Sequence, residues 1–323
     1  MNATAFGLTL PQRAILFGAL TPRLLVDLAC CADQNPFFSS VWVGDSLLAK
    51  PRPDSLTLLG GLATATARVT LGVACMASFP VRDPIVMAYQ WATLDMLSGG
   101  RMLLAVCNGI MRGGGSEAEG RPWSVPDSQR ARRMSERIDV MRTLWSGEES
   151  SFCGEFTRFE GVKLQPQPVQ IPCPIWIAAN PSGVNVAAMD TAFRRVANKA
   201  DGWMTVEQVP GAFGIMWHRL QALLVEAGRD PATFPRMAYH NININDDQAA
   251  GLEESGRFLE NYYGLGFSQA KVAAWTAAGS PKQCVEQLRA LRDQGASQIT
   301  LRITSWDQDR QYRRLVEEVL PEV

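Results

Sequence analysis

The sequence has few of the residues that build metal centres or disulfide frameworks. It contains two histidines, His218 and His240, and seven cysteines with no CxxC pair among them. A structural zinc site or a disulfide scaffold is therefore not expected. A catalytic triad needs a nucleophile, a base and an orienting group that converge, and no such set stands out. Both histidines are predicted to be structural, with His240 facing a layer of helices.

The chain also lacks an excess of charge of either sign, since 31 basic residues stand against 32 acidic ones. This balance gives no electrostatic footprint for nucleic acid or an anionic membrane. No run approaches the ~20 apolar residues of a membrane helix, and the first residues lack the pattern of a signal peptide. GxxxxGK and GxGxxG motifs in the right context are missing, which disfavours a P-loop or a doubly wound NAD-binding domain. We expect a cytoplasmic protein that binds small molecules.

What the sequence does contain is a regular alternation of apolar strand-like runs and helical patterns. Eight strands are predicted, at 6–10, 41–44, 69–75, 102–106, 175–178, 203–206, 236–244 and 299–303. Eight helices are predicted between and after them, at 22–33, 55–65, 84–97, 128–144, 186–199, 212–227, 281–294 and 308–319. With no break in composition, this pattern predicts one α/β domain over residues 1–323, a (β/α)8 TIM barrel.

Three connections are too long for plain turns, namely 107–127, 147–173 and 246–279. The second resembles a hairpin insert, and the third contains Gly251, Gly256, Gly264 and Gly266 and is predicted to be a mobile cover. The carboxyl ends of parallel strands meet at one rim of a barrel, where ligands bind. Long loops at this rim are expected to form or cover the site, although surface decoration is an equally open interpretation.

Residue alternation predicts which strand side chains point into the barrel. In the last strand Thr300, Arg302 and Thr304 alternate with Ile299, Leu301 and Ile303, so the polar set is predicted to face inward. A buried arginine needs a partner because an isolated buried charge is costly. Arg302 is therefore expected to hold an anionic group of a ligand or to pair with an internal carboxylate such as Asp45.

Five blocks of the sequence resemble the bacterial-luciferase-like superfamily of flavin-dependent oxidoreductases. They are SVWVGDSLL at 40–48, ARVTLGVACMASFPVRDPIVMAYQWATLDMLSGGRMLLAV at 67–106, PIWIAANP at 174–181, KADGWMT at 199–205 and GSPKQCVEQLRALRDQGASQITLRI at 279–303. The second block is the most specific, because its order, spacing and DxxSGGR turn all agree. The resemblance implies a barrel with the flavin ring in its mouth and, commonly, a homodimer.

The resemblance also implies positions that contact the cofactor. The Ala74–Cys75 bond resembles the non-proline cis peptide beneath the flavin ring of the family. Arg112 resembles an arginine that binds the FMN phosphate, and Arg132 resembles a second one, in keeping with the fit of guanidinium to phosphate oxygens. Asn180 resembles a phosphate-contacting position. Asn108, Ala179 and Trp203 complete the implied cofactor-binding set.

Asp45 and Ser46 occupy a site where the family often has an acidic residue followed by histidine. Serine is a poor general base without an activating partner, so the role of the histidine is not transferred to Ser46. Asp45, Ser46 and Arg302 are the candidate catalytic residues, and no metal ligand is predicted.

The residues leave three functions open. The first is an FMNH2-dependent monooxygenase that receives its reduced FMN from a separate flavin reductase and oxygenates a small organic substrate. The alternative is hydride transfer by a dehydrogenase or reductase that uses the 8-hydroxy-5-deazaflavin coenzyme. A non-catalytic flavin-binding subunit is the third possibility. Arg112 and Arg132 are the residues that favour FMN.

Overall fold

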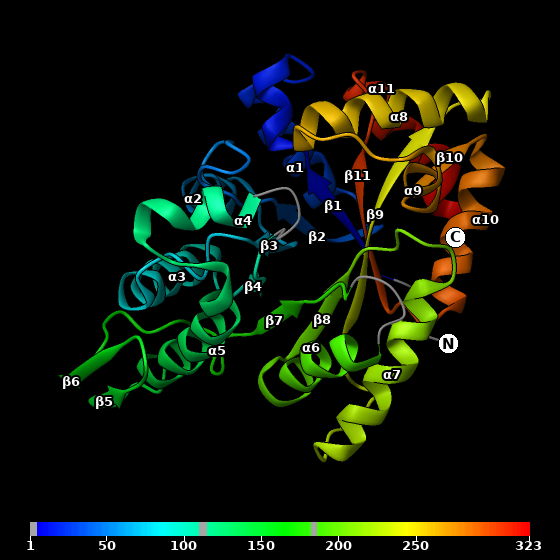
Figure 1. The fold of residues 1–323 in the computed structure, drawn as a ribbon. Coiled ribbons are helices and arrows are strands. Elements are labelled where there is room, and N and C mark those ends of the chain that lie inside the picture. Colours follow the sequence, from blue (N-terminus) through cyan, green and yellow to red (C-terminus); the bar gives the residue numbers. More distant parts are fainter. Residues whose placement is uncertain (1–4, 110–114, 182–185) are drawn as a thin grey trace.

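Eight parallel strands close into a barrel in the computed structural model, which describes residues 5–109, 115–181 and 186–323 (Figure 1). Each strand pairs with its neighbour, and β8 pairs with β9 to complete the circle. The strands are β1 (Ala5–Leu10), β2 (Phe38–Val43), β3 (Thr70–Met76), β4 (Met102–Val106), β7 (Ile175–Ala178), β8 (Gly202–Thr205), β9 (Arg236–Ile244) and β11 (Gln298–Ile303). The predicted (β/α)8 barrel and its eight strands are confirmed.

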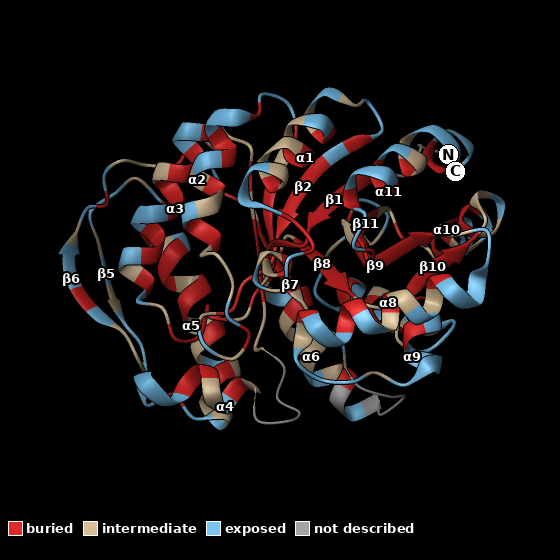
Figure 2. Cartoon of the chain, turned by 90° about the horizontal axis from the view of Figure 1, so that it is seen from above, coloured by how far each residue is buried: buried red, intermediate tan, exposed pale blue. Residues whose placement is uncertain are grey.

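Helices surround the barrel and present their buried faces to it (Figure 2). The long helices that follow the strands are α1 (Pro22–Gln34), α2 (Ser55–Ala65), α3 (Pro84–Ser98), α5 (Asp127–Leu144), α6 (Val186–Lys199), α7 (Ala212–Glu226) and α10 (Pro281–Asp293). Shorter elements are η1 (Gln12–Phe17), α4 (Gly115–Gly120), η3 (Arg121–Trp123), α11 (Gln308–Arg314), η4 (Leu315–Val319) and η5 (Leu320–Glu322).

Helix boundaries follow from local chemistry. The Asp83 carboxylate accepts from the first free backbone N–H groups of α3, and Pro84 fills a position that needs no donor. Gly99 ends the same helix in the left-handed conformation, with φ of 68°. Ser280 and Gln283 form a capping box at the start of α10. These signals explain why the sequence predicts most helix starts to within a residue or two.

All three long connections have structure of their own, and the first, 107–127, contains α4 and η3. The segment 147–173 contains the antiparallel hairpin of β5 (Ser150–Cys153) and β6 (Arg158–Val162), as predicted, which projects beyond α5 (Figure 1). The segment 246–279 is not an open loop, because it forms α8 (Gln248–Tyr263), α9 (Gln269–Ala274) and β10 (Thr276–Gly279). β10 pairs with the last residues of β9, beyond the point where β8 ends. The mobility of this segment stays a prediction.

Two tryptophans fill the lower interior of the barrel. Trp42 on β2 and Trp176 on β7 point inward, with ring centres 6.1 Å apart. They fit only because Gly72 and Gly202 face them: a Cβ atom there would lie 2.3 Å from the Trp42 ring and 2.4 Å from the Trp176 ring. The lumen is therefore a packed core at this level, and any ligand must bind above it, at the carboxyl ends of the strands.

Candidate functional site

Small residues form one wall of the barrel mouth. Ala74, Cys75, Ala105 and Ala178 belong to or pack on the lumenal core from β3, β4 and β7. The Ala74–Cys75 peptide bond is cis, as the family resemblance predicts. These short side chains pack in one cluster with the tryptophan pair, and we call them the small-residue wall. A flat aromatic ring is the kind of group that such a wall accommodates.

A pair of thiols lies on this wall. The thiols of Cys75 and Cys107 influence each other's titration. The neighbouring Cys75 thiol lowers the pKa of Cys107, and the Gly109 backbone N–H acts in the same direction. The neighbouring Cys107 thiol, together with burial, raises the pKa of Cys75 well above its usual value. Cys107 is thus the more acidic of the two thiols.

Arg130 fixes the loops that follow β3 and β4. Its buried guanidinium donates to the backbone carbonyls of Asn108 at 2.5 Å, Ala77 at 2.7 Å and Ser116 at 3.4 Å. Burial lowers its pKa. Asn108 is held in this way, while its side-chain Oδ1 is buried with no hydrogen-bond donor in the described part of the chain. An acceptor of this kind is available to a ligand.

Asp45 and Ser46 are engaged within the protein. Asp45 accepts from Ser55 Oγ and from the Ser78 backbone N–H, both at 2.8 Å, and from Arg82 at 3.4 Å. Ser46 donates to Glu119 at 3.0 Å. These contacts tie the loop after β2 to its neighbours, so the geometry gives both residues a positioning role.

Glu119 on α4 completes this support from the other side of the loop. Besides Ser46, its carboxylate accepts from the backbone N–H groups of Leu47 at 2.6 Å, Leu48 at 3.0 Å and Ala49 at 2.8 Å. Successive N–H groups that converge in this way form an anion-binding concavity, which Glu119 occupies. The sequence analysis did not identify this residue.

Arg302 points into the barrel, as its position in the strand predicts. It is fully buried, and its partners are Asn241 Oδ1 at 2.7 and 3.0 Å and the Tyr263 hydroxyl at 2.9 Å. The expected ion pair with Asp45 is wrong, because Arg302 has no carboxylate within 4.0 Å in the described residues. Instead the guanidinium lies among four aromatic rings, with ring centres 4.5 to 5.3 Å away, from Tyr239, Tyr262, Tyr263 and Trp275.

The two arginines that were predicted to bind a cofactor phosphate are not brought together at the mouth in the described structure. Arg112 lies outside the described residues. Arg132 is exposed and pairs with Glu155 in the β5–β6 hairpin. Because it lies two residues from Arg130, about 200° around the helix, it points away from the loops that Arg130 holds. The structure does not bring Arg132 to the barrel mouth.

Trp203 also lies elsewhere than predicted, because strand alternation turns it outward. Its ring packs on Phe193, Phe213 and Trp217 between the barrel and its helices. Its indole N–H donates to the Ala179 carbonyl at 2.9 Å. Trp203 therefore supports the loop after β7 from behind. Asn180 in that loop is exposed at the end of the small-residue wall.

His240 faces the helix layer, as predicted, between the outward-facing Ala238 and Ile242. Burial lowers its pKa to about 3. Its Nδ1 has no hydrogen-bond partner in the described part of the chain. It is a neutral core residue rather than a catalytic base.

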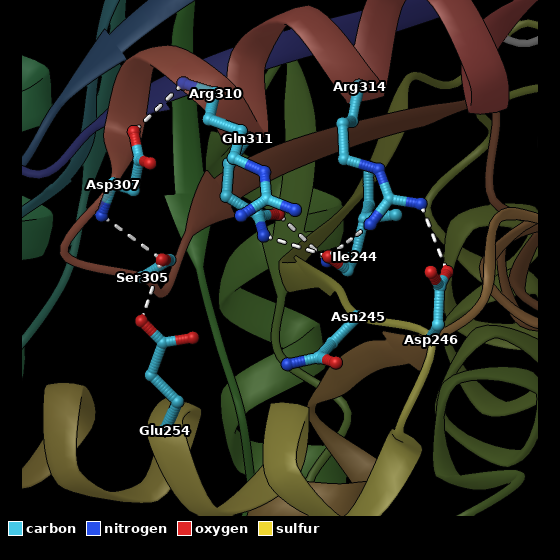
Figure 3. Close-up of a pocket in the computed structure, with 9 residues that line it drawn as sticks. All are labelled: Ile244, Asn245, Asp246, Glu254, Ser305, Asp307, Arg310, Gln311 and Arg314. Carbon is cyan, nitrogen blue, oxygen red and sulfur yellow. Dashed lines mark hydrogen bonds and ion pairs between the residues drawn. The ribbon is translucent and has the colours of Figure 1, made fainter.

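A polar cavity of about 270 Å³ lies outside this mouth, between α8 and α11 (Figure 3). Figure 3 shows its charged groups turned toward protein partners: Glu254 toward Ser305, and Arg314 toward Asp246 and the Ile244 carbonyl. None of the predicted site residues lines it. We therefore place the candidate site in the barrel mouth.

The described residues contain no group of three or more His, Cys, Asp or Glu side chains arranged to hold a metal ion. None of their helices combines the length and the apolar character needed to span a bilayer.

The fold is a (β/α)8 barrel, and its candidate site lies at the carboxyl ends of the strands. A family model described as luciferase-like monooxygenase matches residues 6–298. The chain belongs to this family and is an oxidoreductase.

Relatives and solved structures agree with this assignment. The chain is 26% identical over 318 residues to an F420-dependent glucose-6-phosphate dehydrogenase of Nakamurella multipartita, covering 93% of this chain and 92% of the relative. An uncharacterised protein of Mycobacterium tuberculosis is 35% identical over 204 residues, which are 63% of this chain and 66% of that protein. The fold is similar to an F420-dependent secondary alcohol dehydrogenase, with a TM-score of 0.82, 16% identity and 99% of each chain covered.

Proposed function

We propose that this protein is a deazaflavin-dependent oxidoreductase that transfers a hydride between an 8-hydroxy-5-deazaflavin coenzyme and a small organic substrate. The observation that carries the proposal is similarity along the whole chain to F420-dependent glucose-6-phosphate dehydrogenases, at 26% identity for one and 25% for another. The sequence analysis favoured FMN and oxygenation, with hydride transfer as the alternative. The relatives support the alternative.

The placement of Arg132 agrees with this change. FMN is favoured in the sequence because two arginines, Arg112 and Arg132, are expected to bind its phosphate. Arg132 pairs instead with Glu155 at the protein surface, so this arginine gives no support to FMN. Arg112 is outside the described residues, and its role stays a prediction.

The residues of the mouth fit a planar coenzyme. The small-residue wall presents only short side chains, and Asn108 Oδ1 offers a buried acceptor for a ring N–H group. When bound, the deazaflavin supplies the carbon that gives or takes the hydride. The opposite side of the mouth carries Tyr239, whose hydroxyl donates no hydrogen bond to any described residue. Burial raises its pKa well above the usual value, so it remains protonated and can donate to a substrate oxygen.

Binding of the two coenzymes to the purified protein tests the proposal. We expect the deazaflavin coenzyme to bind, followed by fluorescence or calorimetry, and FMN and FMNH2 to bind at least ~10-fold more weakly, a difference of about 1.4 kcal/mol. Anaerobic reduction of the bound deazaflavin by a panel of alcohols should then proceed without oxygen or a reductase. Tighter binding of FMNH2, with oxygen consumption coupled to substrate, would establish the monooxygenase instead.

A further inference from the structure

Three cationic side chains from the first two loops of the mouth converge on the end of α8. Arg13 in η1 donates to the Tyr262 carbonyl at 2.5 Å. The Arg52 guanidinium lies 5.3 Å from the centre of the Tyr262 ring, with Nη1 3.3 Å from the hydroxyl of the same residue. The Lys50 ammonium lies 5.9 Å from the Tyr263 ring centre. We call Arg13, Lys50 and Arg52 the cation cluster.

The charges of the cation cluster have no ion-pair partner in the described residues, since no carboxylate lies within 4.0 Å of any of the three. Lys50 is only 8% exposed, and its Nζ donates no hydrogen bond to a described residue. Arginine carries five N–H donors and lysine three, and most of them are unused here. Burying an ammonium without a partner is costly, which favours a bound anion.

The surroundings do not neutralise the cluster. Burial lowers the pKa of Lys50, and Arg52 and Arg13 lower it further by repulsion. Burial and Arg52 act on Arg13 in the same way. Two acidic groups, Glu119 and then Cys107, raise the pKa of Lys50. The Glu119 carboxylate makes its hydrogen bonds to the N–H groups of residues 47–49 and forms no ion pair with Lys50. The cluster is therefore a region of positive potential at the entrance of the site.

The cluster and the small-residue wall occupy opposite halves of the barrel. The wall belongs to β3, β4 and β7, whereas the cluster follows β1 and β2 and contacts α8, which comes after β9 and packs on η1. In Figure 1, α8 lies at the end of the barrel where β9 ends. We place the ring on the small-residue wall, so that the cation cluster, which follows other strands, is left for the substrate.

We propose that Arg13, Lys50 and Arg52 bind an anionic group of the substrate, a carboxylate or a phosphate. The two guanidinium forks match the oxygen geometry of such groups, and the ammonium adds a compact charge. Substrate here means the substrate of the proposed function, so the inference rests on that proposal. Arg302 lies behind the same pair of tyrosines and holds them in place through the Tyr263 hydroxyl.

Inorganic phosphate tests the site without any coenzyme. Calorimetry at low ionic strength, with chloride as the reference anion, should show phosphate binding to the wild-type protein. Lys50→Met and Arg52→Met should each weaken it by about tenfold or more. The matched control is Lys282→Met, which removes the same charge from an exposed position on α10 and should leave phosphate affinity unchanged. Removing one of several mutually repelling charges should not lower the melting temperature. A variant with a lowered melting temperature is therefore recognised as misfolded.

A second experiment shows whether the bound anion belongs to the substrate or to the coenzyme. The specificity ratio, kcat/KM for an anionic substrate over that for its uncharged analogue, should fall at least tenfold in Lys50→Met and Arg52→Met, while coenzyme affinity stays the same. If the affinity for the full deazaflavin coenzyme falls, and that for its phosphate-free riboflavin-like form does not, the cluster serves the coenzyme and the inference is overturned.

The two proposals can fail separately. If the deazaflavin binds but phosphate affinity is the same in all variants, only the anion site is wrong. If the deazaflavin does not bind, but phosphate binding depends on Lys50 and Arg52, the proposed function is wrong and the anion site stands.

Discussion

Tyr239 combines three properties that a proton donor needs. It lies in the lumen beside the guanidinium of Arg302, its hydroxyl is free of protein acceptors in the described residues, and burial keeps it protonated. In the proposed reaction a carbonyl substrate needs one proton for each hydride it receives, and we propose this tyrosine as the donor. The Arg302 guanidinium would then stabilise the negative charge that develops on the nearby oxygen.

Tyr239→Phe should therefore lower kcat for hydride transfer by about 10²-fold, which is typical of removing a general acid. The phenyl ring keeps the packing, so coenzyme affinity and melting temperature should not change. Steady-state kinetics and calorimetry check both points. Tyr89→Phe is the control, because that tyrosine is 51% exposed on α3. An unchanged kcat would exclude Tyr239 as the proton donor.

At this scale the sequence predicts strand residues better than loop residues. The inward direction of Arg302 follows from alternation along β11, which is a local property. Its partners come from β9 and α8, which lie 61 and 39 residues away in the chain, respectively. Arg130 and Arg132 look equivalent in the sequence, yet only Arg130 faces the site, because the phase of a helix relative to the barrel is set by tertiary packing. Lys50 and Arg52 carry no recognisable motif.

At the scale of elements, the interior of the barrel depends on pairs of one large and one small residue on neighbouring strands. Trp176 on β7 faces Gly202 on β8, and Trp42 on β2 faces Gly72 on β3. An indole ring cannot move far in a packed interior. Each strand can therefore carry its tryptophan only beside a neighbour that has no side chain.

Gly202→Ala should destabilise the protein by about 1–3 kcal/mol, the usual cost of overpacking a core. Its Cβ would lie 2.4 Å from the Trp176 ring. Gly61→Ala is the matched control, since that glycine is in α2 with no atom within 4 Å of the added Cβ. There the same change should stabilise the helix by about 0.5–1 kcal/mol. Denaturant unfolding of both variants measures the change in unfolding free energy, which should have opposite signs in the two. If Gly202→Ala leaves the unfolding free energy unchanged, the lumen is loosely packed.

The segment 246–279 shows a limit of sequence interpretation at this scale. Its glycines and polar residues indicate a loop, but the Asp247 carboxylate caps α8 and the chain then returns as β10. A four-residue strand such as TAAG carries no alternation of its own. It is defined by pairing with β9, which no local pattern reveals.

At the scale of the whole molecule, buried His240 links stability to pH. Its pKa is about 3 in the folded protein, against an ordinary value of 6.5. Below pH 6.5 the unfolded chain therefore takes up a proton that the folded protein does not, and stability falls as the pH falls toward 3. Above pH 6.5 both states are neutral at this residue, and the effect vanishes.

His240→Leu should remove this contribution. Between pH 7 and pH 5 the wild-type protein should lose about 2 kcal/mol more unfolding free energy than the variant, from 1.36 kcal/mol per pH unit. Urea unfolding at the two pH values measures the difference. His218→Leu controls for the loss of an imidazole, because His218 is exposed on α7. Parallel pH dependences of wild type and His240→Leu would mean that His240 can become protonated in the folded state.

The tryptophan pair inside the barrel has an optical consequence. Trp42 and Trp176 are shielded from water by the strands and lie directly below the mouth, whereas Trp203 and Trp217 lie outside the barrel wall. A coloured ring bound in the mouth would sit within energy-transfer range of the lumenal pair. The emission of the unlabelled protein therefore provides a built-in titration signal, and Trp42→Phe and Trp176→Phe separate this signal from that of the outer indoles.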